Sequence, residues 1–250
     1  MIKKRNLIPA LSLLLLSGCA ELNTIMQSIP TDAPLTEADA AKGLKEALTI
    51  GSKNASSILS AVDGYYGDAL VKIYLPEEAS VIIDNLGRIP GGDKMVEDVI
   101  LRINRAAEDA AKEVAPIFVN SITQMTINDA FSILRGADNA ATQYLSNTTR
   151  TDLYNLYKPK IRQSTEKDIV GGISTKESWE TLTGKWNQFA GSVAGRVGGF
   201  EEVNTDLDDY LTNRALDGMF LKVQDEEKKI RTNVSARVTP LLERVFGSVD

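Results

Sequence analysis

The sequence predicts an all-α protein, a multi-helix bundle of about eight helices with no convincing sheet. Three observations lead to this prediction. Apolar residues recur at helical spacing along most of the chain after residue 35, residues that cap helices precede several of these runs, and glycine or proline follows them. Such helices bury their apolar stripes against one another, with the ridges of one in the grooves of the next.

The first two helices are expected before residue 90. One should cover residues 36–59, because the hydroxyl of Thr36 and the carboxylate of Asp39 can cap free backbone amides. Residues 65–76 are ambiguous, since alternating apolar positions indicate a short extended piece without an obvious partner strand. The next helix should cover residues 76–86, with a proline and two acids in its first turn.

A broad apolar stripe marks residues 96–118 as the longest periodic run of the chain. A helix that is apolar over so wide a face is expected at the centre of a bundle. Pro116 has no backbone N–H to donate, and its ring collides with the preceding turn. We therefore expect it to kink this helix or to split it in two.

Further helices are expected in the second half of the chain. The helix that follows Thr126 and Asp129, which fit an N-terminal cap, should end at Gly136. The glycine-rich residues 191–199 are expected to form a joint within the domain. The remaining helices are expected over residues 138–145, 149–168, 175–189 with Thr175 and Ser178 at the start, 205–230 and 240–246.

The N-terminus has the features of an export signal. Residues 1–5 are cationic, residues 7–16 are mostly apolar, and small residues lead into Cys19, the only cysteine. A charged start, a short apolar run and a small-residue cleavage site are typical of a secretory signal, and the run is too short to span a membrane. Residues 16–19 resemble the lipobox of bacterial lipoproteins, which implies cleavage before Cys19 and attachment of lipid to it.

These features predict a signal peptide (residues 1–18), a lipid-anchored tether (19–34) and a single helical domain (35–250). The anchor would place the domain in the cell envelope. Ala20 favours the periplasmic side of the outer membrane, because an aspartate at that position resembles an inner-membrane retention mark. The expected partners are the membrane, through the lipid, and either an envelope protein or a small-molecule ligand.

The composition excludes several kinds of chemistry. Histidine is absent, which removes the usual general base near neutral pH, the usual zinc ligand and every serine–histidine triad. With Cys19 lipidated, thiolate nucleophiles and intrachain disulfides are excluded too. Removal of the three cations in residues 1–18 lowers the formal net charge from −6 to −9, which opposes binding to nucleic acid. We therefore predict no metal, no cofactor and no nucleic-acid partner.

One group of polar residues is a candidate ligand-binding site. Asn104, Arg105 and Glu108 lie within one turn of the most apolar helix, beside its stripe. Polar groups in such a place need partners within the fold or in a ligand. The ligand alternative adds Asp138 to this site. The other alternative is that internal hydrogen bonds and surface ion pairs satisfy these groups.

Three short motifs match known chemistry without their companion elements. Ser164 and Lys167 fit Ser-x-x-Lys, Tyr154 and Lys158 fit the Tyr-x-x-x-Lys pair of short-chain dehydrogenases, and Asn204, Asp206 and Asp208 imitate a calcium loop. The first two lack their partner motifs, and the third lacks the required glycine and glutamate. We expect ordinary helix faces and a helix cap instead. Similarly, Glu227 and Arg231 are expected to pair on an exposed helix.

Several short segments, distinctive together, carry a family resemblance. They are Asn104-Arg105-Ala106-Ala107-Glu108, Pro116-Ile117-Phe118, Thr126-Ile127-Asn128-Asp129-Ala130, Ala140-Ala141-Thr142-Gln143-Tyr144-Leu145, Asp206-Leu207-Asp208-Asp209-Tyr210, Ala215-Leu216-Asp217-Gly218-Met219-Phe220, Glu227-Lys228-Lys229-Ile230-Arg231 and Val245-Phe246-Gly247. In these segments the chain resembles a bacterial family called domain of unknown function 4197, from about residue 35 to residue 247. The resemblance implies a helical, exported protein, often with a lipoprotein-like start, and implies no activity for any residue.

Three functions are open at this point. The first is a binding or interaction module tethered by its lipid, which the polar residues on the central helix favour. The second is an envelope hydrolase built on two carboxylates, for which the candidates are Glu97, Asp98, Glu108 and Asp109. Adjacent acids on one helix do not face each other as glycoside hydrolysis requires. The third is a structural tether without a ligand. We favour the binding module over an enzyme.

Overall fold

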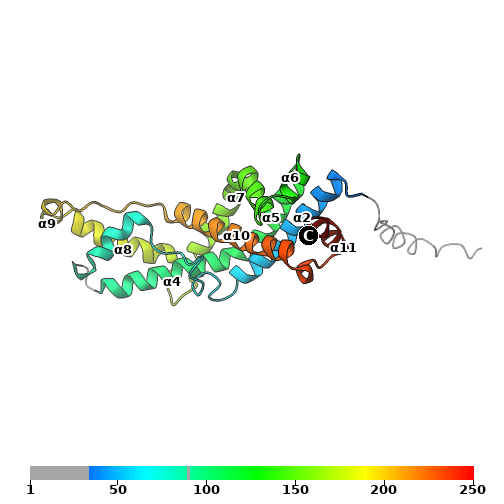
Figure 1. Ribbon diagram of the computed structural model, residues 1–250. Helices are drawn as coiled ribbons and strands as arrows, with labels where there is room; N and C mark the ends of the chain where they lie inside the picture. Colours follow the sequence, from blue (N-terminus) through cyan, green and yellow to red (C-terminus); the bar gives the residue numbers. More distant parts are fainter. Residues whose placement is uncertain (1–33, 89–90) are drawn as a thin grey trace, which may run out of the picture. The chain divides into compact units, whose positions relative to one another are not determined.

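The computed structural model describes residues 34–88 and 91–250 (Figure 1). In these ranges the protein is all-α, as the sequence predicts, with no strand and one isolated bridge between Val170 and Ile173. None of the helices described is both long and apolar enough to cross a bilayer. Thr36–Asp250 form one compact unit. The predicted signal peptide, Cys19 and the tether up to residue 33 lie outside the described residues.

The helices follow one another through short connections, apart from the loop of residues 60–76. The α-helices of the described ranges are α2 (Glu37–Leu59), α3 (Ser80–Asp84), α4 (Gly92–Ala111), α5 (Val114–Gln124), α6 (Ala130–Leu134), α7 (Ala140–Thr165), α8 (Thr175–Ala190), α9 (Val193–Val197), α10 (Leu207–Thr232) and α11 (Pro240–Phe246). Single 3₁₀ turns lie at Glu77–Ala79, Leu86–Arg88, Val234–Ala236 and Gly247–Val249.

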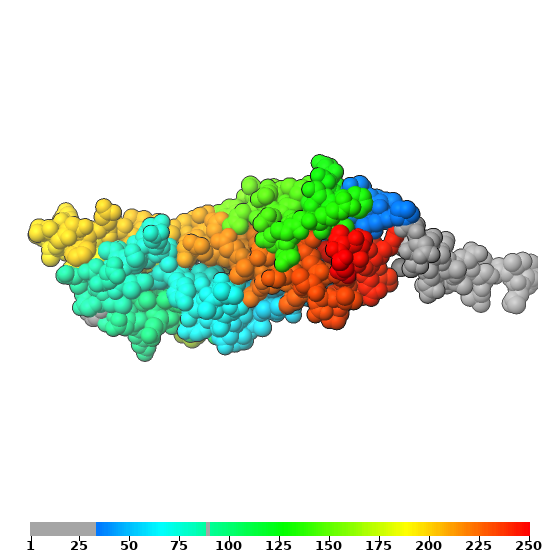
Figure 2. All heavy atoms as spheres, viewed as in Figure 1, coloured from blue at the N-terminus to red at the C-terminus, as the bar shows by residue number. Residues whose placement is uncertain are grey.

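Two sets of helix contacts build the core of this unit. α10 packs most extensively against α2 and α7, and α4 packs against α8 and α7. The space-filling view shows α10 (orange) between green residues of the α5–α7 region and cyan residues near position 60 (Figure 2). Phe118 of α5 meets Phe220 of α10 with ring centroids 5.3 Å apart. Burying each such large apolar side chain stabilises the fold by about 1.5–3 kcal/mol.

The N-terminal helices largely follow their local signals. Thr36 and Asp39 form a capping box at the start of α2, as predicted. Residues 65–71 form mostly turns and residues 72–76 have no regular secondary structure, so this segment forms no strand. The predicted split near Pro116 is confirmed, because α4 ends at Ala111 and α5 begins at Val114. Pro116 lies in the first turn of α5, where its missing N–H leaves no hydrogen bond unmade.

The expected break between residues 145 and 149 is wrong, because α7 runs without interruption for 26 residues. Residues 146–149 are all polar, and Thr148 and Thr149 donate their hydroxyls to carbonyls of the preceding turn, which keeps them within the helix. Two caps also differ from the expectation. Asp129, rather than Thr126, is the N-cap of α6, and Ser174 with Glu177 forms the capping box of α8.

The glycine-rich residues 191–199 contain the short helix α9, whose N-cap is Ser192. Aromatic side chains join the two ends of this segment, since the Trp186 and Phe200 rings lie 5.6 Å apart, centroid to centroid, and Phe189 contacts both. The guanidinium of Arg88 lies 5.0 Å from the Phe200 centroid. The segment is thus anchored at its base, and its role as a joint stays a prediction.

Candidate functional site

The side chain of Asn104 binds the backbone of the 60–76 loop. Its Oδ1 accepts a hydrogen bond from the Ile73 N–H at 2.9 Å, and its Nδ2 donates to the Ile73 carbonyl at 2.7 Å. Nδ2 also donates to the Ile100 carbonyl in the preceding turn of α4. The amide is fully buried. It therefore supplies, from a helix, the pair of hydrogen bonds that a neighbouring strand would otherwise give to Ile73.

Glu108 and Arg105 hold the start of the same loop. Glu108 Oε1 accepts hydrogen bonds from the backbone N–H groups of Tyr65 and Tyr66, each at 3.1 Å. Arg105 donates to Glu108 Oε2 at 2.6 Å and to Asp63 Oδ1 at 2.7 Å. Burial opposes the charge of Arg105, but these two hydrogen bonds outweigh burial and raise its pKa. Asp63 adopts a left-handed backbone at φ 67°, which directs the chain into the loop.

Asp138 does not join the other three residues. It lies before α7, and its carboxylate is 3.9 Å from the Lys228 ammonium on the exposed surface. The structure therefore brings together Asn104, Arg105 and Glu108, which lie on one face of α4, and leaves Asp138 apart. The three use their polar atoms to fasten the 60–76 loop, and their proposed role in ligand binding stays a prediction.

The two residues of the Ser-x-x-Lys motif meet the same carboxylate. Ser164 donates its hydroxyl to Asp109 Oδ2 at 2.9 Å, and Lys167 donates to that atom at 2.5 Å. Burial raises the pKa of Asp109, but hydrogen bonds from Lys167, Lys112 and Ser164 lower it to about 2. Both side chains donate to Asp109 rather than to each other, so Lys167 is not placed as a base for the Ser164 hydroxyl. The same contacts argue against Asp109 as the acid of a hydrolase.

Tyr154 and Lys158 likewise meet one acid. The Tyr154 hydroxyl donates to Asp209 Oδ1, and Lys158 Nζ lies 3.1 Å from the same oxygen. The dehydrogenase chemistry needs a tyrosine that ionises easily, whereas burial and the Asp209 carboxylate raise the pKa of Tyr154. The pair therefore fastens α7 to the first turn of α10.

The acids of the calcium-like stretch have structural partners. Asp206 is the N-cap of α10, as predicted, and accepts from the Asp209 N–H at 3.1 Å. Asp208 accepts from Arg162 at 3.1 Å and from the Thr165 hydroxyl at 2.7 Å. Among the residues that the structure describes, no group of three or more carboxylates, histidines or cysteines could hold a metal ion.

Glu227 and Arg231 do form the predicted pair, at 2.8 Å, but the expected exposure is wrong. Their side chains are 1% and 7% exposed. The Glu227 carboxylate accepts from the backbone N–H groups of Ala141 and Thr142 at the start of α7, and Arg231 donates to the Ile133 and Leu134 carbonyls. The pair is buried because it joins the end of α6 and the start of α7 to α10.

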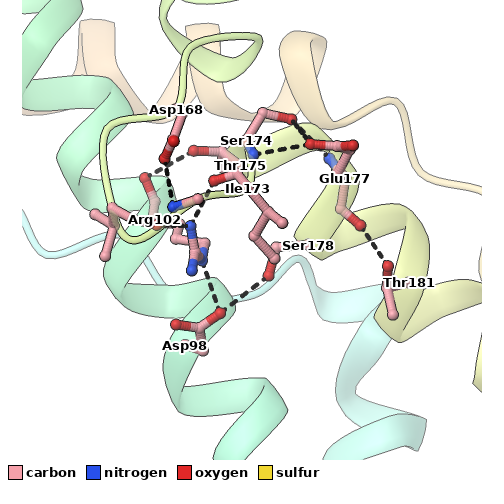
Figure 3. Close-up of polar contacts among 11 residues, drawn as sticks. Asp98, Arg102, Asp168, Ile173, Ser174, Thr175, Glu177, Ser178 and Thr181 are labelled. Atoms are coloured by element: carbon pink, nitrogen blue, oxygen red, sulfur yellow. Dashed lines mark hydrogen bonds and ion pairs between the residues drawn. The ribbon is translucent and has the colours of Figure 1, made fainter.

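Arg102, which the sequence pattern did not single out, fixes the corner between α7 and α8 (Figure 3). Its guanidinium, on a residue 6% exposed, pairs with Asp98 at 2.7 Å and donates to the carbonyls of Val170 and Ile173. Gly172 supplies the positive φ of 92° that this tight corner requires. The Thr175 hydroxyl donates back to the Arg102 carbonyl at 3.2 Å. These contacts place the start of α8 against α4.

A cleft of about 540 Å³ lies along the next turns of α8. We call it the α8 cleft. The end of α7, with Arg162 and Glu166, forms one wall, and the segment 203–208 forms the other. Its floor is the face of α8 that carries Lys176, Glu180, Gly184 and Asn187.

Hydrogen bonds fix both walls of the α8 cleft. The Asn187 side chain accepts from the Val203 N–H at 2.8 Å and donates to the Val203 carbonyl at 3.0 Å, which holds the segment 203–208 on α8. The Trp186 indole N–H donates to the Glu201 carbonyl at 2.9 Å. Across the cleft, Arg162 and Asp208 tie α7 to α10. The walls are therefore positioned in the free protein, as in most small-molecule sites.

Two residues on the floor of the α8 cleft, Gly184 and Glu180, are not explained by packing or by polar contacts within the described part of the chain. Gly184 lies inside a helix, where glycine costs about 1 kcal/mol relative to alanine. A Cβ at this position would meet no atom within 4 Å, so close packing does not require the glycine. The carboxylate of Glu180, one turn earlier, makes no hydrogen bond or ion pair within the described part of the chain. A glycine inside a helical pattern is one sequence signal for this cleft, and the calcium-like stretch with Asn204, Asp206 and Asp208, which also lines it, is another.

Comparison with known proteins identifies one family. Residues 34–247 match the family described as "Protein of unknown function (DUF4197)". No curated protein and no solved structure matches the chain.

Proposed function

The chain belongs to the DUF4197 family, and we propose that it is a lipid-anchored cell-envelope protein that binds a small polar ligand in the α8 cleft. The observation that carries the binding proposal is Gly184, an exposed glycine on the floor of the cleft whose cost in helix stability no packing contact explains. A residue that lowers helix stability is found inside a helix where the function requires the space that a side chain would fill.

The charges that line the α8 cleft favour a ligand with a positive group. Two cations, Arg162 and Lys176, face four carboxylates. Asp208 neutralises Arg162 at 3.1 Å, and Glu166 lies 3.8 Å from Lys176. The remaining acids include Glu180, which has no partner within the described residues. A positive group beside Glu180 would therefore gain an ion pair without breaking one.

The anchor in this proposal rests on the N-terminal sequence. Residues 1–18 have the pattern of an export signal, and Cys19 ends a stretch that resembles a lipobox. Together with a lipid-bound N-terminus, the α8 cleft would make the protein a tethered binding module. The hydrolase alternative has less support, because Asp98, Glu108 and Asp109 all have cationic partners.

A thermal-shift panel tests the binding proposal. The full chain with Cys19→Ser is heated alone and with putrescine, lysine, arginine or glycyl-lysine, and with succinate as an anionic counterpart. At about 100 times its Kd, a ligand of the right class should raise Tm by roughly 5–10 °C. If no cation raises Tm while succinate does, the charge argument is wrong. If no compound of any charge raises it, the protein is better described as a structural tether.

A further inference from the structure

A second hollow, of about 580 Å³, lies between α5 and α7. We call it the α5–α7 groove. Residues 120–126 at the end of α5 form one side, and residues 148–156 of α7 form the other. It shares no lining residue with the α8 cleft.

The chemistry of this lining differs from that of the chain as a whole. Seven of its ten residues carry an amide or a hydroxyl side chain, two are apolar, and Asp152 alone is charged. A quarter of all residues in the chain are charged, whereas this lining has one charged residue and no lysine or arginine. Amide and hydroxyl groups both donate and accept hydrogen bonds, which suits a ligand that does the same.

Much of this hydrogen-bonding capacity is free. Gln124 Nε2 donates to Asn120 Oδ1 at 2.9 Å, which leaves the side-chain N–H groups of Asn120 and the side-chain carbonyl of Gln124 for other partners. The side chains of Ser121, Asp152 and Asn155 make no hydrogen bond or ion pair within residues 34–88 and 91–250. Spacings of three and four residues place Asn120 with Gln124 on one face of α5 and Asp152 with Asn155 on one face of α7.

Apolar surface accompanies these groups. Leu156 is 49% exposed, and Met125 is held in the lining by the Thr148 hydroxyl, 3.6 Å from its sulfur. An apolar surface flanked by neutral donors and acceptors matches a molecule that has C–H faces and hydroxyl edges. Asp152 is the one charged side chain of this lining. A cationic ligand could pair only with Asp152, and an anionic ligand would be repelled by it.

We propose that the α5–α7 groove binds a neutral saccharide, with Asn155 and Asp152 bonded to its hydroxyls and Leu156 against a ring face. No aromatic side chain lines the groove, so stacking adds nothing and the expected Kd is on the order of 1 mM. This site and its ligand are separate from the α8 cleft, and either can be wrong without the other.

The test is an NMR titration of the ¹⁵N-labelled full chain, with Cys19→Ser, against maltose, cellobiose and glucose, with glucuronate as the charged counterpart of glucose. At least one neutral disaccharide should shift the amide signals of residues 120–126 and 148–156. Glucuronate should bind about tenfold more weakly than glucose or not at all, because Asp152 repels it. Asn155→Asp keeps the shape but removes a donor and adds a second carboxylate, so it should weaken disaccharide binding at least about tenfold.

The matched control is Asn147→Asp. Asn147 is an exposed asparagine of the same helix that lies outside the groove and has no hydrogen bond from its side chain within the described residues, and its variant should bind the disaccharide as the unmodified chain does. Three results would each overturn the proposal. They are no shift at roughly ten times the expected Kd, shifts that cluster around Gly184 instead, and equal weakening by both variants.

Discussion

The carboxylate of Glu227 on α10 accepts the hydroxyl of Thr142 on α7 at 2.6 Å, with both side chains buried. The same carboxylate receives two backbone N–H groups from the first turn of α7, where a negative charge is favoured by the helix dipole, and it pairs with Arg231. One side chain thus satisfies the start of a helix that is 85 residues away in sequence.

Replacing Glu227 should destabilise the fold severely. Glu227→Ala leaves the Arg231 charge and two helix N–H groups buried without their partner, so the free energy of unfolding should fall by about 3–5 kcal/mol. Urea unfolding followed by circular dichroism measures this change. Asp225→Ala, which removes a half-exposed carboxylate 3.9 Å from Lys222, is the control and should change the value by less than about 1 kcal/mol. Equal effects of the two variants would contradict the buried-cap interpretation.

The Asp109 cluster predicts a loss of stability in acid. Its carboxyl has a pKa of about 2 in the fold and an ordinary value of 3.8. A lowered pKa stabilises the fold at every pH above the unfolded value, and this contribution disappears as the pH falls from about 4 to 2. It amounts to about 2 kcal/mol. Between pH 5 and pH 2 the unmodified chain should lose that much more stability than Asp109→Asn, as measured by urea unfolding at each pH. Parallel curves would contradict this.

Asn104 should act through the 60–76 loop. Asn104→Ala leaves both backbone groups of Ile73 without partners, so we expect a loss of about 2–4 kcal/mol in the free energy of unfolding. Hydrogen exchange at the Ile73 amide should accelerate together with that of Tyr65 and Tyr66, because the loop is held at both places. If the variant kept its stability and this protection, the earlier idea that Asn104 contacts a ligand would regain support.

The anchor prediction concerns Cys19. In the producing cells, Cys19→Ser should abolish labelling by a radioactive or clickable fatty acid and move the protein out of the membrane fraction. The helical content of the purified protein should not change, because the compact unit begins at Thr36. A Ser17→Thr variant, which keeps the cysteine, serves as the control for expression. Retained labelling of Cys19→Ser would refute the anchor.

Local signals predicted the helices well, and long-range contacts explain most of what they did not predict. The capping box of α2 is encoded by Thr36 and Asp39, three residues apart, so the sequence alone identifies it. Arg102 gave no such signal, because the carbonyls that it binds are 68 and 71 residues away. Glu227 and Arg231 were correctly paired at a spacing of four residues, but their burial depends on α6 and α7, about 85–98 residues away.

The candidate site was harder to predict than the fold. The polar residues of α4 stood out because they lie beside an apolar stripe, and the structure gives them partners in the 60–76 loop. The α8 cleft is assembled from three separate parts of the chain, and the local signals for it are Gly184 and the polar stretch 204–208. A glycine within a helical pattern has several explanations. Close packing is excluded here by the open space around the Cα of Gly184, and that space is known only from the folded structure.

The most direct test of the central claim uses Gly184→Leu and Gln188→Leu, two leucine substitutions one turn apart on α8. Gly184 lines the α8 cleft, whereas Gln188 is exposed outside it. Leucine has a high helix propensity, so Gly184→Leu should be at least as stable as the unmodified chain. Isothermal titration with the cation that gives the largest thermal shift should show binding by the unmodified chain and Gln188→Leu, and at least about a hundredfold weaker binding by Gly184→Leu. Unchanged affinity in a folded Gly184→Leu would contradict the assignment of the α8 cleft.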